Sequence, residues 1–311
     1  MLLPFPLEDR YYRYSYFLRK KFGTKVYKIG VDAGFTCPTR DGTLGTRGCL
    51  YCNNLSFSVD RRKGLKSVKE QIRESIEKLK ERKKADKFLV YFQAYTNTYA
   101  PVEKLEKLYA EALSFKDVVG LCIGTRPDCV NDEILKILSD LNKDYFISVE
   151  YGVESVYDKN LDWAQRGHDF KTSVMAIEKT KRYGLDVAAH IIFGFPGETK
   201  SEILMSAEKI NVLPVDSIKV HNLHVVKNTP LEYYYGSNPF KLFSEEEWIE
   251  IIADFLEKLR PDIVIQRLIG EAKNNTLVAP NWKRSKSWIL NEIRNTLEKR
   301  GTFQGCKYNI D

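Results

Sequence analysis

Residues 28–56 have the sequence KIGVDAGFTCPTRDGTLGTRGCLYCNNLS and contain three of the six cysteines in this 311-residue chain. Two residues separate Cys49 from Cys52, as in many metal-chelating pairs, and eleven separate Cys37 from Cys49. A zinc site would normally need a fourth Cys or His nearby, and this segment contains none. An iron–sulfur cluster usually takes four cysteines, so three leave one iron with an open position for a cofactor. The segment therefore predicts a metal centre held by these three thiols.

The composition predicts a globular protein of the cytoplasm that does not cross a membrane. Hydrophobic residues make up 43% of the chain, and no segment reaches the roughly 18 consecutive apolar residues of a membrane span. The first residues do not resemble a secretory signal, so we expect the six cysteines to be thiols or ligands rather than disulfides. The formal charge of +7 is compatible with nucleic acid binding but also with an ordinary solvated surface.

Strand and helix patterns alternate through most of the chain. We expect helices at residues 67–87, 101–113, 131–141, 172–183 and 201–211. We expect strands at residues 24–31, 88–92, 118–124, 145–151, 187–193 and 217–226. About six β-α units require a mainly parallel sheet covered by helices, either an open doubly wound sheet or a partial barrel.

Polar and glycine-rich residues follow each of the expected strands. In both possible architectures, ligands bind at the carboxyl ends of the strands. One such residue would mean little, because loops need turn residues in any case. Their recurrence at every strand end predicts one shared site, and the segments concerned are 93–98, 124–128, 150–155 and 193–199, together with His221 and His224.

The two ends of the chain lie outside this alternation, which predicts an N-terminal arm (1–23), a core (24–228) and a C-terminal extension (229–311). Residues 10–22 interleave aromatic and basic residues, either as an arm that contacts nucleic acid or as a helix that packs its aromatic face, and the pattern favours packing. The extension is expected to contain a helix at 244–259, with a capping box from Ser244 to Glu247, a strand at 263–268, a loop at 270–281 and a helix at 287–297.

The cysteine segment and the strand-end motifs resemble the radical S-adenosylmethionine (SAM) superfamily, in the branch of the Elongator catalytic subunit and the coproporphyrinogen-dehydrogenase-like proteins. The resemblance implies a partial (β/α)6 TIM-like barrel with a C-terminal α+β extension. It also implies a [4Fe–4S] cluster on Cys37, Cys49 and Cys52 with SAM on the open iron. Residues 32–52, QAYTNTYAP (93–101), GTRPDC (124–129), QRL (266–268), Trp282 and Lys286 together resemble the YhcC/YtqA group of this superfamily.

The same resemblance suggests which residues bind the cofactor. Residues 92–98, FQAYTNT, replace the family's Phe-Gly-Gly-Gly-Thr-Pro-Thr pattern, and residues 150–155, EYGVES, match a motif whose first polar residue faces the ribose. Arg166-Gly-His168 resembles a motif whose arginine approaches the methionine carboxylate, which suits a planar guanidinium. The residues expected at the cofactor are Gln93, Thr96, Asn97, Arg126, Glu150, Ser155, Arg166, Gly194 and Pro196.

The resemblance further implies reductive cleavage of SAM to a 5′-deoxyadenosyl radical that abstracts hydrogen from the substrate. In the YhcC/YtqA group it points to conversion of the carboxymethylaminomethyl side chain of wobble uridine 34 in tRNA to aminomethyl. The partners would be tRNA and an electron donor such as flavodoxin or ferredoxin. The residues expected at the substrate are Arg40, Tyr95, His168, His221, Trp282, Lys283 and Lys286, with Tyr99 and the tyrosines at 233–235 as further stacking candidates for which packing is favoured.

Two other functions stay open on the sequence alone. One is a radical SAM enzyme that acts on a small molecule or a tetrapyrrole, and the other is a non-catalytic metal-binding or cofactor-chaperone module. Cys122 and Cys129 are expected to be buried thiols, and the solitary Cys306 argues against a second cluster. His190, inside an expected strand, could equally be structural.

Overall fold

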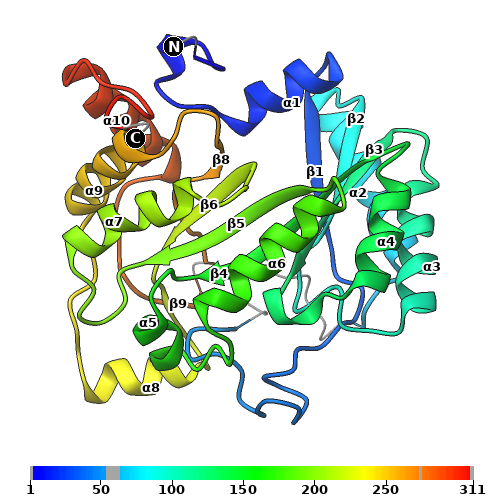
Figure 1. Ribbon diagram of the computed structural model, residues 1–311, viewed down its shortest axis with the longest axis horizontal. Coiled ribbons are helices and arrows are strands. Elements are labelled where there is room, and N and C mark those ends of the chain that lie inside the picture. Colours follow the sequence, from blue (N-terminus) through cyan, green and yellow to red (C-terminus); the bar gives the residue numbers. More distant parts are fainter. Residues whose placement is uncertain (1–2, 54–63, 273–274, 309–311) are drawn as a thin grey trace.

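The computed structural model describes residues 3–53, 64–272 and 275–308. Its centre is a parallel sheet with the strand order β1-β2-β3-β4-β5-β6-β8, curled into a partial barrel (Figure 1). The strands are β1 (Val26–Val31), β2 (Lys87–Phe92), β3 (Val118–Thr125), β4 (Phe146–Glu154), β5 (Asp186–Phe193), β6 (Ser217–Asn222) and β8 (Val264–Arg267). The fold class inferred from the resemblance, a partial TIM-like barrel, is confirmed.

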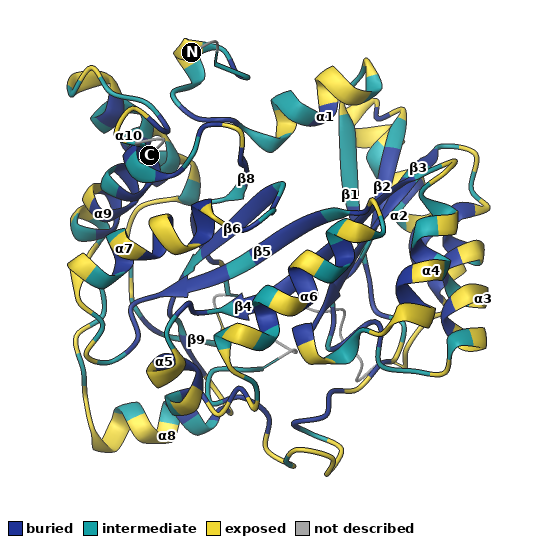
Figure 2. Ribbon diagram, viewed as in Figure 1, coloured by how far each residue is buried: buried dark blue, intermediate teal, exposed yellow. Residues whose placement is uncertain are grey.

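Five helices follow the first five strands and cover the outer face of the sheet: α2 (Val68–Lys83), α3 (Val102–Leu113), α4 (Asp132–Leu141), α6 (Phe170–Arg182) and α7 (Lys200–Asn211). Each has an apolar stripe, and Figure 2 shows these helices with buried residues toward the sheet and exposed residues toward solvent. Side-chain caps fix several helix starts, such as the capping boxes at Ser67 and Thr199. Helices and strands therefore share one continuous apolar core between them.

The N-terminal arm closes the gap between the edge strands β1 and β8 at the amino ends of the strands. Helix α1 (Tyr14–Phe22) lies at the edge opposite to the cysteine segment (Figure 1). The Tyr12 carbonyl accepts a 2.7 Å hydrogen bond from the amide of Ile265 in β8, and the Phe17 ring packs 6.2 Å from the Phe146 ring. The interpretation of the arm as a packing element is confirmed.

The C-terminal extension contributes to the sheet as well as covering it. The expected helix at 244–259 is α9 (Glu245–Lys258), with its capping box from Ser244 to Glu247, and α10 (Lys286–Lys299) packs beside it. The expected strand at 263–268 is β8, which pairs in parallel with β6 as the seventh strand of the barrel sheet.

The expected strand at 217–226 is wrong in its second half. Strand β6 ends at Asn222, and β7 (Val225–Val226) pairs antiparallel with β9 (Leu277–Ala279), a strand within the expected loop at 270–281. The chain bends because the amide of Leu223 still bonds to Phe193 of β5 (2.9 Å), while the Asn222 side chain accepts from the amide of Gly270 (3.1 Å). Residues 217–226, SIKVHNLHVV, contain no glycine or proline that would have indicated this bend in the sequence.

The expected helix at 67–87 is shorter in the structure, because α2 ends at Lys83 and Lys87 already begins β2. Three further elements differ from expectation. Strand β4 continues to Glu154, three residues beyond its expected end, and the short helices α5 (Asp158–Trp163) and α8 (Pro230–Ser237) were not expected. The cysteine segment at 28–56 is described through residue 53, and residues 54–56 lie outside the described part. In the described part, no helix combines the length and apolar character needed to cross a membrane.

Candidate active site

A cavity of about 560 Å³ opens at the carboxyl ends of the strands. Residues from or directly after β1 through β6, and from β8, line it, as expected for a barrel of this type. All three cysteines of the N-terminal segment, Cys37, Cys49 and Cys52, are among its lining residues. The six cysteines of the chain are free thiols.

The long interval between Cys37 and Cys49 folds back on itself. The amide of Arg40 bonds to the Cys37 carbonyl (2.8 Å), and the amide of Gly48 bonds to the Thr39 carbonyl (2.8 Å). The Arg40 guanidinium then donates a 2.5 Å hydrogen bond to the carbonyl of Cys52. These bonds bring Cys49 and Cys52 back to the cavity that Cys37 borders.

The thiols differ in how readily they ionise. Burial acts to raise the pKa of Cys37. Hydrogen bonds from Thr39 and Thr96 outweigh this effect, so the pKa is lowered. The Thr39 hydroxyl lies 3.1 Å from the Cys37 sulfur. Burial, together with Cys49, raises the pKa of Cys52 to about 11. Because metal ligation requires thiolates, loading the site must displace a proton from Cys52.

This donor set fits a [4Fe–4S] cluster, in which each thiolate binds its own iron and the fourth iron stays open. Among the described residues, no three His, Cys, Asp or Glu side chains are grouped so that they could hold a single metal ion. A cluster does not require such a group, because each of its cysteines binds a different iron. The cysteines outside this segment differ. Cys122 is fully buried, with its pKa raised to about 11 by burial, and Cys129 is half-buried beside Asp128.

Two buried guanidinium groups border the cysteines. Arg126 donates twice to the Asp128 carboxylate (2.8 and 2.7 Å), and Arg166 donates to the Gly152 carbonyl (2.7 Å) and approaches the Cys49 sulfur (3.6 Å). Arg126 Nη1 and Arg166 Nε are buried and have no hydrogen-bond partner among the described residues. Since a buried donor without an acceptor is costly, these atoms are suited to an anionic ligand such as a carboxylate.

Glu150 does not lie on the cysteine side of the cavity. Its carboxylate is fully buried and pairs with Lys28 (2.6 Å), with Lys219 and with His190 (3.1 Å). Glu154, further along β4, lies 3.7 Å from the Arg166 guanidinium instead. Residues two or four apart in a strand lie on the same face of the sheet, so the sequence places Glu150 and Glu154 on one face. Glu154 is nearer to the carboxyl end of the strand, where the cysteines were expected.

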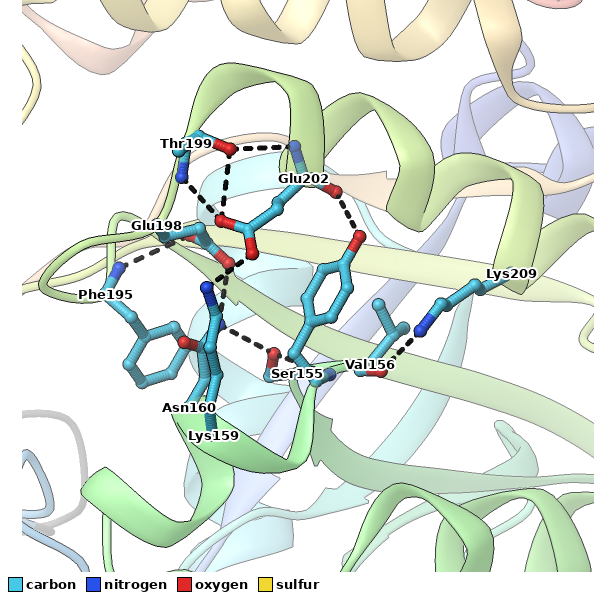
Figure 3. A network of polar contacts seen from close by, with 10 residues as sticks. Ser155, Val156, Lys159, Asn160, Phe195, Glu198, Thr199, Glu202 and Lys209 are labelled. Atoms are coloured by element: carbon cyan, nitrogen blue, oxygen red, sulfur yellow. Dashed lines mark hydrogen bonds and ion pairs between the residues drawn. The ribbon is translucent and has the colours of Figure 1, made fainter.

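A buried polar network joins the ends of β4 and β5 behind the cavity (Figure 3). The Asn160 amide donates to the Ser155 hydroxyl (3.0 Å) and to the Glu198 carboxylate (2.8 Å). Glu198 also accepts from the amides of Gly194 (2.6 Å) and Phe195 (3.3 Å). Burial raises the pKa of Glu198 to about 7. Ser155 and Gly194 belong to this network, and Ser155, Gly194 and Pro196 are not among the residues that line the cavity.

The cavity brings together most of the predicted site residues. Those that line it are Cys37, Cys49, Cys52, Arg40, Gln93, Tyr95, Thr96, Arg126, Glu150, Arg166 and His221. Asn97 instead bonds to the Gly124 carbonyl (2.8 Å), which ties the end of β2 to β3. Polar lining residues outside the predicted site include Tyr51, Tyr91, His190, Lys219, Asn222, Arg267 and Glu271, whereas Glu154 and His224 belong to the strand-end segments expected at the site.

Several residues predicted at the substrate lie outside the cavity lining. His168 is half-buried beside Arg166, and burial lowers its pKa to about 4. Trp282 donates to the Phe243 carbonyl (2.9 Å), Lys283 borders a separate surface groove, and Lys286 pairs with Glu271. The tyrosines outside the cavity make other contacts. Tyr99 bonds to Thr43 (3.0 Å), while Tyr234 and Tyr235 pack against Trp163 and Phe240.

Comparison with known proteins places this geometry in a family. Residues 43–210 match the Radical SAM superfamily, and residues 215–299 match the Radical_SAM C-terminal domain. The protein YtqA of Bacillus subtilis (strain 168) is 35% identical over 308 residues, which are 97% of this chain and 95% of YtqA. The tRNA uridine(34) acetyltransferase of Methanocaldococcus infernus is 30% identical over 192 residues, which are 60% of this chain and 35% of that protein.

The fold agrees with a solved structure. That of archaeal Methanocaldococcus infernus Elp3 with an N-terminal deletion superposes with a TM-score of 0.68 at 22% identity, covering 90% of this chain and 64% of Elp3. The matches span the cysteine pair, the strand-end motifs and the C-terminal helices. The chain belongs to the radical S-adenosylmethionine superfamily, and its cofactors are a [4Fe–4S] cluster and SAM.

Proposed function

We propose that this enzyme converts the carboxymethylaminomethyl side chain of wobble uridine 34 in tRNA to aminomethyl. The two-carbon acid would leave as glyoxylate with an oxygen atom from water, and SAM, cleaved to methionine and 5′-deoxyadenosine, would accept the two electrons. The observation that carries the proposal is one shared cavity, in which the three cysteines and two arginines lie beside a second, basic region. Its volume of about 560 Å³ lies in the usual range for small-molecule and cofactor sites. The similarity to a tRNA uridine(34) acetyltransferase supports uridine 34 as the target, although that protein is much longer than the matched region.

The residues of the cavity have separate roles in this proposal. Cys37, Cys49 and Cys52 hold the cluster, which together with SAM supplies a 5′-deoxyadenosyl radical when both are bound. Arg126 and Arg166 bind the methionine carboxylate through their unpaired buried N–H groups.

The remaining cofactor and substrate contacts follow from the same lining. Gln93, Thr96 and Glu154 line the cavity and would contact the polar groups of SAM, and Tyr95 would stack on the extruded uracil. Ser155 and Gly194 would act through the network around Glu198, and Pro196 lies in the turn between Gly194 and Glu198.

The proposed partners are tRNA and an electron donor such as flavodoxin or ferredoxin. Lys286 pairs with Glu271, which lines the cavity. The basic segment with Lys283, Arg284 and Lys286 therefore lies next to the cavity at Lys286. We propose that this basic segment contacts tRNA phosphates.

Mass spectrometry of tRNA nucleosides from a strain without the gene tests the function. We expect carboxymethylaminomethyluridine to accumulate and aminomethyluridine to disappear. The wild-type gene should restore the product, and a Cys49→Ala gene should not. Unchanged levels of both nucleosides would remove this function.

A radical SAM enzyme for a small carboxylic acid or a tetrapyrrole is the second candidate. The buried lysines beside Glu150 favour it, because they would suit a carboxylate of either kind of substrate. This candidate predicts turnover without tRNA and no effect of charge reversal at Lys283 and Arg284.

A further inference from the structure

The part of the cavity formed by β6 and β8 carries a group of cationic side chains that the cofactors do not need. Lys219 in β6 is cross-strand partner to Arg267 in β8, and both line the cavity. Lys28 from β1 reaches the same region, where it donates to Gln266 (2.7 Å) as well as to Glu150. Arg126 and Arg166, in contrast, follow β3 and α5 and face the cysteines.

Positive charge exceeds negative charge in this region. Glu150 is the carboxylate that pairs with Lys28 and Lys219, and His190 also contacts it. The other carboxylates lining the cavity have partners elsewhere, Glu154 beside Arg166 and Glu271 with Lys286. One carboxylate thus faces two lysines and Arg267, and burial, with Lys28 adding to it, lowers the pKa of Lys219 to about 7.

Two donors in the same region have no acceptor. The guanidinium of Arg267 forms no side-chain hydrogen bond or ion pair with any described residue, although the residue lines the cavity. The amide nitrogen of Asn222 is buried and also has no partner among the described residues, while its oxygen is fixed by the amide of Gly270 (3.1 Å). Polar groups in protein interiors normally have a hydrogen-bond partner, so these two donors suit an acceptor that a ligand in the cavity would supply.

Gly270 holds the region in shape. A Cβ atom at this position would lie 3.0 Å from His224 Cε1, 3.4 Å from Asn222 Oδ1 and 3.4 Å from His221 Nδ1. The backbone after β8 therefore closes directly over the three side chains at the end of β6.

We propose that Lys219, Arg267 and Asn222 form a subsite that binds a carboxylate of the substrate. If the proposed function holds, on which this identification rests, the ligand is the carboxylate of the carboxymethylaminomethyl group. The subsite then selects uridines that carry the acid and releases the aminomethyl product, which lacks it. A carboxylate there would also complete the hydrogen bonding of Arg267 and Asn222 and balance the charge of Lys219.

The test uses the anaerobically reconstituted holoenzyme with saturating SAM, so that the methionine carboxylate site is already occupied. The probes are N-methylglycine, which has the amine and acid of the side chain, and N-methylglycinamide, which lacks the acid, at matched ionic strength. Anaerobic differential scanning fluorimetry should show a saturable rise in Tm with N-methylglycine and none with the amide, because a ligand stabilises the state that binds it.

Variants assign the effect to the subsite. Lys219→Met and Arg267→Gln should each weaken N-methylglycine binding about tenfold or more, the equivalent of roughly 1.4 kcal/mol. Lys258→Met, at a surface lysine that pairs with Glu208, should change nothing. Lys219→Met removes a partner of the buried Glu150 carboxylate and can prevent folding. Arg267→Gln removes no such partner, so it still tests the subsite if Lys219→Met does not fold. Unchanged affinity in both variants would overturn the proposal, as would a larger Tm rise with inorganic phosphate than with N-methylglycine.

A second measurement separates this proposal from the proposed function. Anticodon stem-loops with carboxymethylaminomethyluridine are supplied to the wild-type enzyme and to Arg267→Gln. No conversion by the wild type, with N-methylglycine binding still dependent on Arg267, refutes the function and keeps the subsite. Equal conversion by both proteins at limiting RNA keeps the function and refutes the subsite.

Discussion

Single residues decide whether the cysteine segment can hold its shape. Gly48 has a φ of +76°, and a Cβ atom there would lie 2.8 Å from the Arg40 guanidinium carbon. Arg40 in turn bonds to the carbonyl of Cys52. The hydrogen bond from Arg40 to Cys52 thus holds the segment between Cys37 and Cys52 in shape, and Arg40 can take this position because residue 48 is a glycine.

Replacing Gly48 with alanine should lower cluster occupancy, because the methyl group displaces Arg40 and releases Cys52. We expect less than half of the wild-type iron and sulfide per chain after anaerobic reconstitution. Gly42→Ala is the matched control, since Gly42 also has a positive φ (+97°) but no atom within 4 Å of its Cβ position. The backbone strain of a non-glycine residue is similar in both variants. Equal iron loss in the two would contradict the role of Arg40.

Replacing Arg166 with lysine should weaken SAM binding while the protein stays folded. A lysine has one charged nitrogen and cannot serve Gly152, Cys49 and an anion together as the planar guanidinium does. We expect at least a tenfold rise in the Kd for SAM, about 1.4 kcal/mol, measured by anaerobic equilibrium dialysis. Arg284→Lys, near the start of α10, is the control. A Kd within twofold of the wild-type value for Arg166→Lys would argue against this contact.

Asp186, at the start of β5, should make stability depend on pH. Burial, with the nearby Asp216, raises its pKa to about 7 from the ordinary 3.8. The folded chain therefore holds a proton that the unfolded chain has lost between about pH 4 and pH 7, so the free energy of unfolding falls as pH rises through this window. Asp186→Asn should remove the fall and be more stable than the wild type at pH 8, by about 2 kcal/mol.

Urea denaturation at pH 5 and pH 8 measures this difference. The exposed Asp144→Asn, at the turn before β4, should change the unfolding free energy equally at both values. If Asp186→Asn is no more stabilising at pH 8 than at pH 5, the raised pKa is refuted.

At the scale of elements, the two chain ends close the incomplete barrel together. Gln304 is fully buried and accepts from the amide of Tyr12 (2.9 Å), while its own amide donates to the carbonyls of Arg260 (2.9 Å) and Ile263 (2.8 Å). It thereby ties the N-terminal arm to the segment that leads into β8. Lys28 and Gln266 join the same two edges inside the barrel.

Gln304→Leu should lower the free energy of unfolding by about 3 kcal/mol, because buried backbone groups would be left without hydrogen-bond partners. Gln304→Glu keeps the acceptor for Tyr12 but removes the two donors, and should also be destabilising. Chemical denaturation of the apoprotein under reducing conditions measures both. A decrease below about 0.5 kcal/mol for Gln304→Leu, typical of a surface change, would show that this side chain does not hold the ends together.

The elements also show how far the sequence predicts the structure. Helices such as α3 and α9 were predicted to within a residue or two, because their apolar period and capping residues are local signals. The break after β6 was not, since it depends on Gly270, 48 residues away from Asn222. In the site, the cysteines and Arg166 could be predicted from motifs, whereas Lys219 and Arg267 meet only after β8 joins β6.

At the scale of the whole molecule, the two ends of the barrel differ. The cavity lies at the end of the barrel formed by the carboxyl ends of the strands, and the basic end of α1 lies at the opposite end (Figure 1). Basic residues are therefore found both at positions 283–286 and at the end of α1, far from the cavity. If tRNA reaches the cavity, the lysines of the two surfaces should differ in their effect on binding.

Charge reversal at Lys283 and Arg284 should weaken tRNA binding and lower the slope of log Kd against log salt, by about one for each phosphate that the variant no longer neutralises. Lys20→Glu with Lys21→Glu makes the same charge change on α1 and should leave the slope unchanged. Filter binding at several salt concentrations measures both. Equal effects of the two double variants would contradict tRNA binding at the carboxyl edge.

The most direct test of the proposed function is a single-turnover assay with the reconstituted enzyme, a chemical reductant, SAM and tRNA that carries carboxymethylaminomethyluridine at position 34. Mass spectrometry of the digested tRNA and of the small molecules follows both halves of the reaction. We predict aminomethyluridine together with 5′-deoxyadenosine, and neither product from Cys52→Ala. Formation of 5′-deoxyadenosine at the same rate with and without this tRNA, and with no aminomethyluridine, would contradict the proposed function.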